Sequence, residues 1–407
     1  MKKTFFKMTA PVAGIMAAFT FLSCNDADNN MMNLPSQKTI TFENVVTPKD
    51  FVQSGSFQGT GAVPVILPSQ SVSITFSAGK AQALMFATMY GASKDWFFAS
   101  QQPGIKLFDA NGKAITGDVS SSVLLWDNGT KDNMTGQKES KPITQVPNVI
   151  ASQLMKLNLD YNSETSEFTL TITNTSGGTV HETPFSPGVW AVSNYNGSQL
   201  LNSAPFFTPN ALSNPEITDI AQMGDIDKMK TKLNANTGIM TGLSPALVII
   251  YRGDKNPIYE LGKMDTGMGL KAIAQFGNVS KLQNSLKSFP GIKGIYVAGN
   301  SPVPPGNKIM TNFKADPGDK IAYVTMFGFS NDWFYANEIS IDATVKGDLS
   351  SKTTLFDSGT GIDQYPGAGN NQALFGGTPQ SETMVISKVG NQYPVPAVQN
   401  VIKVTIN

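Results

Sequence analysis

The sequence has few of the side chains on which most catalytic chemistry depends. Its 407 residues include one cysteine, Cys24, one histidine, His181, and one arginine, Arg252. A lone cysteine excludes disulfides within the chain, and a lone imidazole cannot build a histidine-rich metal site. A single guanidinium also excludes the arginine clusters that grip phosphate groups, so nothing in this composition predicts nucleic-acid binding.

Recognisable catalytic motifs are lacking as well. His181 lies in "VHETPF", which begins like a zinc-protease helix but has no second histidine four residues on, and Pro184 would break the helix. No Gly-x-Ser-x-Gly turn is present to hold a serine nucleophile. We therefore expect a protein that is not an enzyme.

The first residues predict a membrane anchor. The lysines of "MKKTFFK" precede "APVAGIMAAFTFL", an apolar run too short to span a bilayer, and "LSC" ends at Cys24. This pattern is typical of a lipoprotein signal, so we expect residues 1–23 to be removed and Cys24 to carry lipid that holds the protein on a membrane. The alternative is a cleaved signal with a chance cysteine.

Residues 24–37 are polar, acidic and non-periodic, which predicts a flexible tether. Acidic residues directly behind a lipidated cysteine resemble the surface-export signal of one class of bacterial lipoproteins. That resemblance implies an outer-membrane lipoprotein of the cell envelope, exposed at the cell surface. The signal removes three of the chain's 30 basic residues, which leaves about three more acidic than basic side chains and no attraction for anionic partners.

Two long blocks of the sequence repeat one design. "MFATMYGASKDWFFA" from residue 85 matches "AYVTMFGFSNDWFYA" from residue 322, and each is followed by a second shared segment, at 117–130 and 347–360. Apolar and polar residues alternate between Gly, Pro and Asp breaks, as they do in antiparallel strands. We predict a mainly β fold with two antiparallel β-sandwich domains, at residues 38–175 and 296–407.

A shorter duplication fills residues 176–295. "SPGVWAVSN" and "SPALVIIYR" predict buried strands, and a helical pattern of apolar residues follows each of them. The apolar positions are Ile217, Ile220, Ala221, Ile226, Met229 and Leu233, and then Leu270, Ile273, Ala274, Val279, Leu282 and Leu286. We expect these strand-helix segments to have a buried structural role between the two sandwiches.

Each block also carries an unusual acid before aromatic residues. An Asp-Trp-Phe stands at 95–97 and 332–334, and an aromatic-Asp-small-Gly-Thr turn follows at 126–130 and 356–360. These motifs resemble those of the spondin amino-terminal domain family, and the resemblance extends over most of the chain after the tether. It implies β-sandwiches related to calcium-dependent lipid-binding domains, with calcium held by acids at one end.

The resemblance implies one set of calcium ligands in each block. The sets are Asp95, Asp127 and Asn133 in the first block and Asp332, Asp357 and Asp363 in the second. Animal members of the family often carry another Asp directly after the Gly-Thr, where this chain has Lys131 and Gly361. The nearest acids or amides beyond those positions are Asp132 and Asn133 in the first block and Asp363 in the second.

Asp332 itself allows two interpretations. In the first, its carboxylate shares a cation with Asp357 and Asp363, and calcium is favoured because the donors are hard oxygens on loops, without imidazole or thiolate. In the second, Asp332 accepts hydrogen bonds from the backbone of the neighbouring turn, and Asp357 opens its own Gly-containing turn. The residues alone leave both open.

Together these features predict a non-enzymatic, lipid-anchored cell-surface protein whose spondin-like modules bind or adhere to an unidentified protein or glycan. The alternative is a carbohydrate-binding or carbohydrate-processing envelope protein. A glycan binder needs aromatic platforms on its surface. We instead expect all four tryptophans to be largely buried, namely Trp96, Trp126, Trp190 and Trp333.

Overall fold

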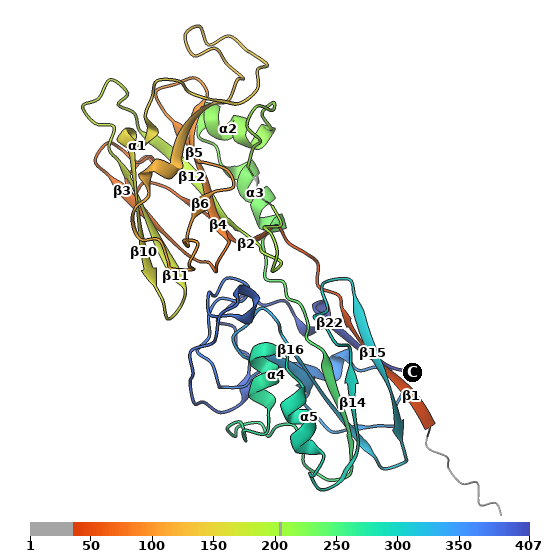
Figure 1. Ribbon diagram of the computed structural model, residues 1–407. Helices are drawn as coiled ribbons and strands as arrows, with labels where there is room; N and C mark the ends of the chain where they lie inside the picture. Colours follow the sequence, from red (N-terminus) through yellow and green to blue (C-terminus); the bar gives the residue numbers. More distant parts are fainter. Residues whose placement is uncertain (1–35, 203–205) are drawn as a thin grey trace, which may run out of the picture. The chain divides into compact units, whose positions relative to one another are not determined.

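The computed structural model describes residues 36–202 and 206–407 (Figure 1). The signal, most of the tether and Cys24 lie outside these residues. Within the described part, strands form four antiparallel sheets that enclose two separate hydrophobic cores. The mainly β fold with two antiparallel sandwiches is thus confirmed. No helix in the described ranges has the length and apolar character needed to cross a membrane.

The first sandwich packs a four-stranded sheet against a seven-stranded one. The smaller sheet has the order β3 (Ser71–Ser77), β11 (Glu167–Asn174), β10 (Met155–Asn162), β7 (Gly117–Asp118). The larger has the order β2 (Phe51–Phe57), β12 (Phe185–Ser193), β4 (Ala83–Tyr90), β5 (Trp96–Ser100), β8 (Val123–Asp127), β9 (Thr144–Gln145), with β6 (Ile105–Lys106) beside β4. Alternate residues of β10 and β11 are buried, which gives these strands the period-two pattern of a half-buried sheet.

The second sandwich repeats this strand order. Its smaller sheet runs β15 (Lys308–Ala315), β1 (Ser36–Asn44), β22 (Ile402–Ile406), β19 (Gly347–Asp348). Its larger sheet runs β14 (Ile292–Ala298), β13 (Ala246–Tyr251), β16 (Lys320–Met326), β17 (Trp333–Asn337), β20 (Thr353–Asp357), β21 (Ser387–Lys388), with β18 (Ile341–Asp342) beside β16. Every residue of β13 is buried, because sheet partners flank it and both faces are covered.

A pair of helices covers the outer face of each larger sheet (Figure 1). These are α2 (Pro215–Met223) with α3 (Asp227–Asn236), and α4 (Leu270–Phe276) with α5 (Ser280–Leu286). Asn214 caps α2 by accepting the Ile217 N–H at 2.9 Å, and Gly224, with φ of 66°, ends the helix. Short helical turns complete the elements at α1 (Ala151–Leu154), η1 (Ser120–Ser122), η2 (Ser350–Lys352), η3 (Ala373–Phe375) and η4 (Val398–Asn400).

Strand pairing corrects the expected domain boundaries. The sequence places residues 38–44 in the first sandwich, but β1 pairs with β15 and β22 in the second. Residues 176–295 do not form a separate segment either, because β12 is a central strand of the first sandwich and β13 and β14 belong to the second. Local periodicity identifies a strand, but it does not say which distant strand it pairs with.

The two sandwiches have the same strand order but a different chain order. In the first, β10 and β11 are consecutive strands of one hairpin. Their counterparts in the second, β22 and β1, are the last and first strands of the described chain. The second sandwich is therefore a circular permutation of the first, and the whole first sandwich is inserted between its β1 and β13.

Candidate metal centre

Strand pairing brings two predicted acids together in each sandwich. Asp332 directly precedes β17 and Asp357 ends β20, and these strands pair Trp333 with Asp357. In the first sandwich, β5 and β8 pair Trp96 with Asp127 in the same way. We call residues 95 and 127–141 the first loop end, and residues 332 and 357–384 the second loop end.

Only one of the two carboxylate oxygens of Asp332 accepts hydrogen bonds from the neighbouring turn. Its Oδ2 accepts hydrogen bonds from Ser358 Oγ at 2.8 Å, Thr360 N at 2.7 Å and Gly361 N at 3.0 Å. Its Oδ1 has no hydrogen-bond partner, although the residue is fully buried. A buried carboxylate oxygen without a partner is costly, so the turn contacts alone do not account for this side chain.

Three further acids lie near Asp332. One carboxylate oxygen from each of Asp332, Asp357 and Glu382 lies within 4.8 Å of the other two. Asp363 stands outside this triad, but its Oδ1 is also buried without a partner, and the charges of Asp357 and Asp332 act on it. The structure thus gathers the three acids predicted for the second block and adds Glu382.

The pKa values of these four acids are all raised above their ordinary values. Burial, together with the charge of Asp332, raises the pKa of Asp357 to about 7. Burial, together with the charges of Asp357 and Asp332, raises the pKa of Asp363 to about 8. Burial is also the main cause that raises the pKa values of Asp332 and Glu382. Like charges in a desolvated cluster favour either proton uptake or a bound cation.

No basic side chain within residues 36–202 and 206–407 neutralises the cluster. The ion pairs in this part of the chain involve other acids, such as Asp319 with Arg252 and Glu338 with Lys388. Bound protons or a bound cation, and not an ion pair among the described residues, would therefore offset the repulsion among these carboxylates.

The first loop end also holds a buried aspartate against its turn, but an amide lies beside it where the second loop end has further acids. Asp95 is fully buried, and its Oδ2 accepts from Thr130 N at 2.7 Å and Lys131 N at 2.8 Å. Its Oδ1 accepts from Asn133 Nδ2 at 3.1 Å, and the same nitrogen lies 3.4 Å from Asp127 Oδ2. All predicted residues of the first block are brought together, and the Asn133 amide joins the two carboxylates.

Sequence reasoning missed three side chains that build these ends. Gln222 of α2 donates to Thr130 Oγ1 at 2.9 Å, and Gln275 of α4 donates to the Thr360 carbonyl at 3.0 Å. Their signal was available, because both glutamines stand in the repeated "IAQ" of the two helices. Glu382 carries no such signal, since only the folded loop brings it to Asp332.

The tryptophans are buried with one exception. Trp126, Trp190 and Trp333 are 7%, 9% and 1% exposed. Trp96 is only partly buried and lines a hollow of about 230 Å³ together with Asp127, Asn133 and Glu139. An aromatic surface among polar groups is therefore present at the first loop end and not at Trp333, its buried counterpart in the second.

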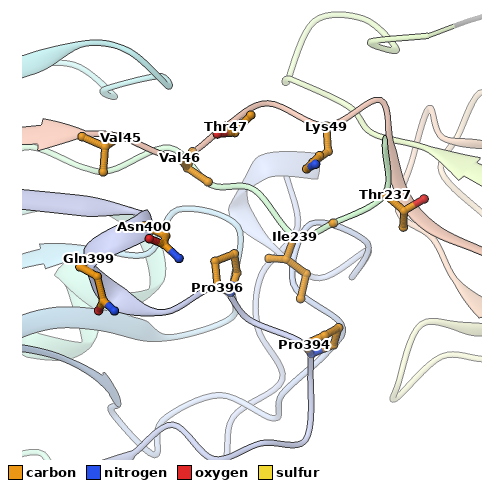
Figure 2. A pocket seen from close by; sticks show the side chains of 11 residues that line it. Val45, Val46, Thr47, Lys49, Thr237, Ile239, Pro394, Pro396, Gln399 and Asn400 are labelled. Carbon is orange, nitrogen blue, oxygen red and sulfur yellow. The ribbon is translucent and has the colours of Figure 1, made fainter. Parts of the chain in front are cut away.

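A separate groove of about 570 Å³ is lined by none of the residues of the two loop ends (Figure 2). Three segments line it, at residues 45–49, 237–239 and 394–400. Lys49 is its only charged side chain, and the Nζ of that lysine donates to the Ala235 carbonyl at 2.7 Å. Its other polar side chains, those of Thr47, Thr237, Gln399 and Asn400, are uncharged.

No protein-family model matches this chain, and no curated protein matches it.

Proposed function

We propose that the protein is a non-catalytic binding module of the cell envelope that binds calcium at its second loop end. Two observations carry the calcium site: the Oδ1 of the fully buried Asp332 has no hydrogen-bond partner, and one carboxylate oxygen from each of Asp332, Asp357 and Glu382 lies within 4.8 Å of the other two. A cation would supply the missing partner and offset the repulsion among the acids.

The donor set favours calcium over transition metals. All the candidate ligands are carboxylates, and they come from separate segments: Asp332 before β17, Asp357 at the end of β20, and Glu382 before β21. Ca²⁺ accepts a variable number of oxygen ligands in flexible geometry, which suits side chains that arrive from loops. Zinc and copper sites rely on imidazole or thiolate ligands, and the cluster contains neither.

Calcium at this position would join the chain segments that form one end of the second sandwich. Loops at the end of a rigid sandwich are common places for ligand recognition. A cation shared between such loops would restrict their conformations before a partner binds, which lowers the entropy cost of binding. The lipid anchor predicted at Cys24 and the resemblance to spondin domains support adhesion at the cell surface as the use of this module.

Calorimetric titration of calcium into the protein without its signal peptide tests the site. We expect saturable binding, a higher melting temperature in calcium than in chelator, and loss of both in the double variant Asp332→Asn, Asp357→Asn. Asp254→Asn is the matched control, because the Asp254 side chain is fully exposed. Absence of heat and of any melting shift in the unmodified protein would refute the calcium site.

A second candidate function rests on the first loop end. The hollow beside Trp96 combines an indole face with Asp127, Asn133 and Glu139, and such mixtures of aromatic and planar polar groups suit the binding of sugars. A glycan array probed with the unmodified protein and with Trp96→Phe tests it. Glycan signals that the substitution abolishes would support sugar binding, and an array without signal would exclude it.

A further inference from the structure

We infer that side chains of the first loop end take the place of a cation there, so that only the second loop end takes up a divalent ion. In the first loop end, the amide of Asn133 donates to Asp95 and Asp127, and the ammonium group of Lys141 pairs with Glu139. The inference rests on the proposed function of the second loop end and adds which end binds, how many ions bind and which residues decide it.

The two ends are comparable residue by residue. The carboxylates of Asp95 and Asp332 each accept the backbone N–H of the threonine in the turn, at 2.7 Å in both cases. The backbone N–H of Glu139 donates to the Thr130 carbonyl, and that of Glu382 donates to the Thr360 carbonyl. Glu139 and Glu382 therefore occupy the same place, and differences between the ends can be assigned to single side chains.

The first difference is at the third residue after the threonine. Asn133 holds this position in the first end, and Asp363 holds it in the second. The Lys94 backbone N–H donates to Asn133 Oδ1 at 2.8 Å, which turns the NH₂ group toward Asp95 and Asp127. The amide thus places two partly positive hydrogens between two carboxylates, where Asp363 brings another acid.

The second difference lies two residues after the equivalent glutamates, Glu139 and Glu382. Lys141 forms an ion pair with Glu139, with 2.6 Å between Nζ and Oε1. Met384 stands in the equivalent position, because its N–H donates to the Gly359 carbonyl as the Lys141 N–H does to that of Gly129. Glu382 consequently has no lysine beside it and lies with Asp332 and Asp357 instead.

Two reciprocal exchanges test the inference. The first-end exchange, Asn133→Asp with Lys141→Met, gives that end the acids and the apolar residue of the second. The second-end exchange, Asp363→Asn with Met384→Lys, does the reverse. Gly361 stays unchanged, because a Cβ there would approach the Pro379 Cβ to 2.9 Å. Asn300→Asp serves as a control for one added charge at an exposed position.

Calcium calorimetry and melting in chelator are measured for all four proteins. We expect one ion for the unmodified protein and for Asn300→Asp, two for the first-end exchange, and none for the second-end exchange. The second-end exchange should also melt above the unmodified protein in chelator, because it removes one acid from the cluster and adds a lysine at position 384. This readout keeps the inference testable even if the first-end exchange fails to fold.

The outcomes separate this inference from the proposed function. An unmodified protein that binds two ions overturns the inference and leaves the calcium site of the second loop end intact. A folded first-end exchange that still binds one ion overturns it as well. An unmodified protein that binds no ion overturns the proposed function, and this inference with it.

Discussion

Asn44 and Asn174 make the same buried contacts in the two sandwiches. The Nδ2 of Asn44 donates to the Thr241 and Val303 carbonyls, both at 2.9 Å. The Nδ2 of Asn174 donates to the carbonyls of residues 66 and 183, at 2.9 and 2.8 Å. Each asparagine ends its strand and ties it to two loop segments, although one lies near the start of the described chain and the other in its middle.

Replacing Asn44 should destabilise the protein. Asn44→Ala leaves two buried carbonyl groups without their donor, and such groups cost about 1–3 kcal/mol. Urea unfolding at constant pH and calcium concentration measures the loss. Asn312→Ala is the control, because that residue is exposed, and its change should stay within about 0.5 kcal/mol. Equal losses in the two variants would show that the buried amide of Asn44 is not important.

The stability of the calcium-free protein should fall as the pH rises from 5 to 8. The folded-state pKa values of Asp357 and Asp363, about 7 and about 8, lie above the ordinary value of 3.8. The folded protein therefore holds more protons than the unfolded chain in this window, and the stabilisation present at low pH is lost as these acids ionise.

Denaturant unfolding in chelator at pH 5, 6, 7 and 8 measures this dependence. Calcium should remove most of the loss, because the cation then replaces the protons. The double variant Asp357→Asn, Asp363→Asn should show a flatter profile in chelator. A calcium-free protein that is equally stable across this window would contradict the clustering of the acids.

Replacing Gln275 should weaken calcium binding, although Gln275 is not one of the candidate ligands. It is buried in α4 and donates to both the carbonyl and the Oγ1 of Thr360, in the turn that also binds Asp332. Residues that orient metal ligands typically alter affinity by about 10- to 100-fold when removed. We expect Gln275→Ala to weaken calcium binding by about 10-fold in calorimetry.

Gln222→Ala provides the matched control for that measurement. Gln222 holds the corresponding Thr130 turn of the first loop end. Its loss should leave calcium affinity unchanged if only the second end binds the ion. Equal weakening by both variants would mean that the helices act on calcium binding through general stability instead of through the Thr360 turn.

The sequence predicts the local parts of this molecule well. Alternating apolar residues identify strands such as β10 and β11, and the repeated motifs single out Asp332 and Asp357, which the pairing of β17 with β20 brings together. Both expectations depend on neighbours in the chain or on one strand pair. The same reasoning finds the duplicated strand-helix segments, because their periodicity is local too.

Contacts between distant segments are what the sequence does not reveal. Glu382 lies 50 residues after Asp332, and only the path of the intervening loop brings the two together. The pairing of β1 with β15 and β22 likewise depends on hydrogen bonds across most of the chain. The lysine beside Glu139 is visible in the sequence, but its role appears only when the two loop ends are compared.

The insertion of the first sandwich has a consequence for the order of folding. All strands of the first sandwich lie between residues 51 and 193, so this unit can close soon after synthesis or export delivers that stretch. Phe42 of β1 instead pairs with Val404, close to the last residue of the chain. The second sandwich therefore completes its smaller sheet only when β22 is available to β1, after every strand of the first sandwich is present.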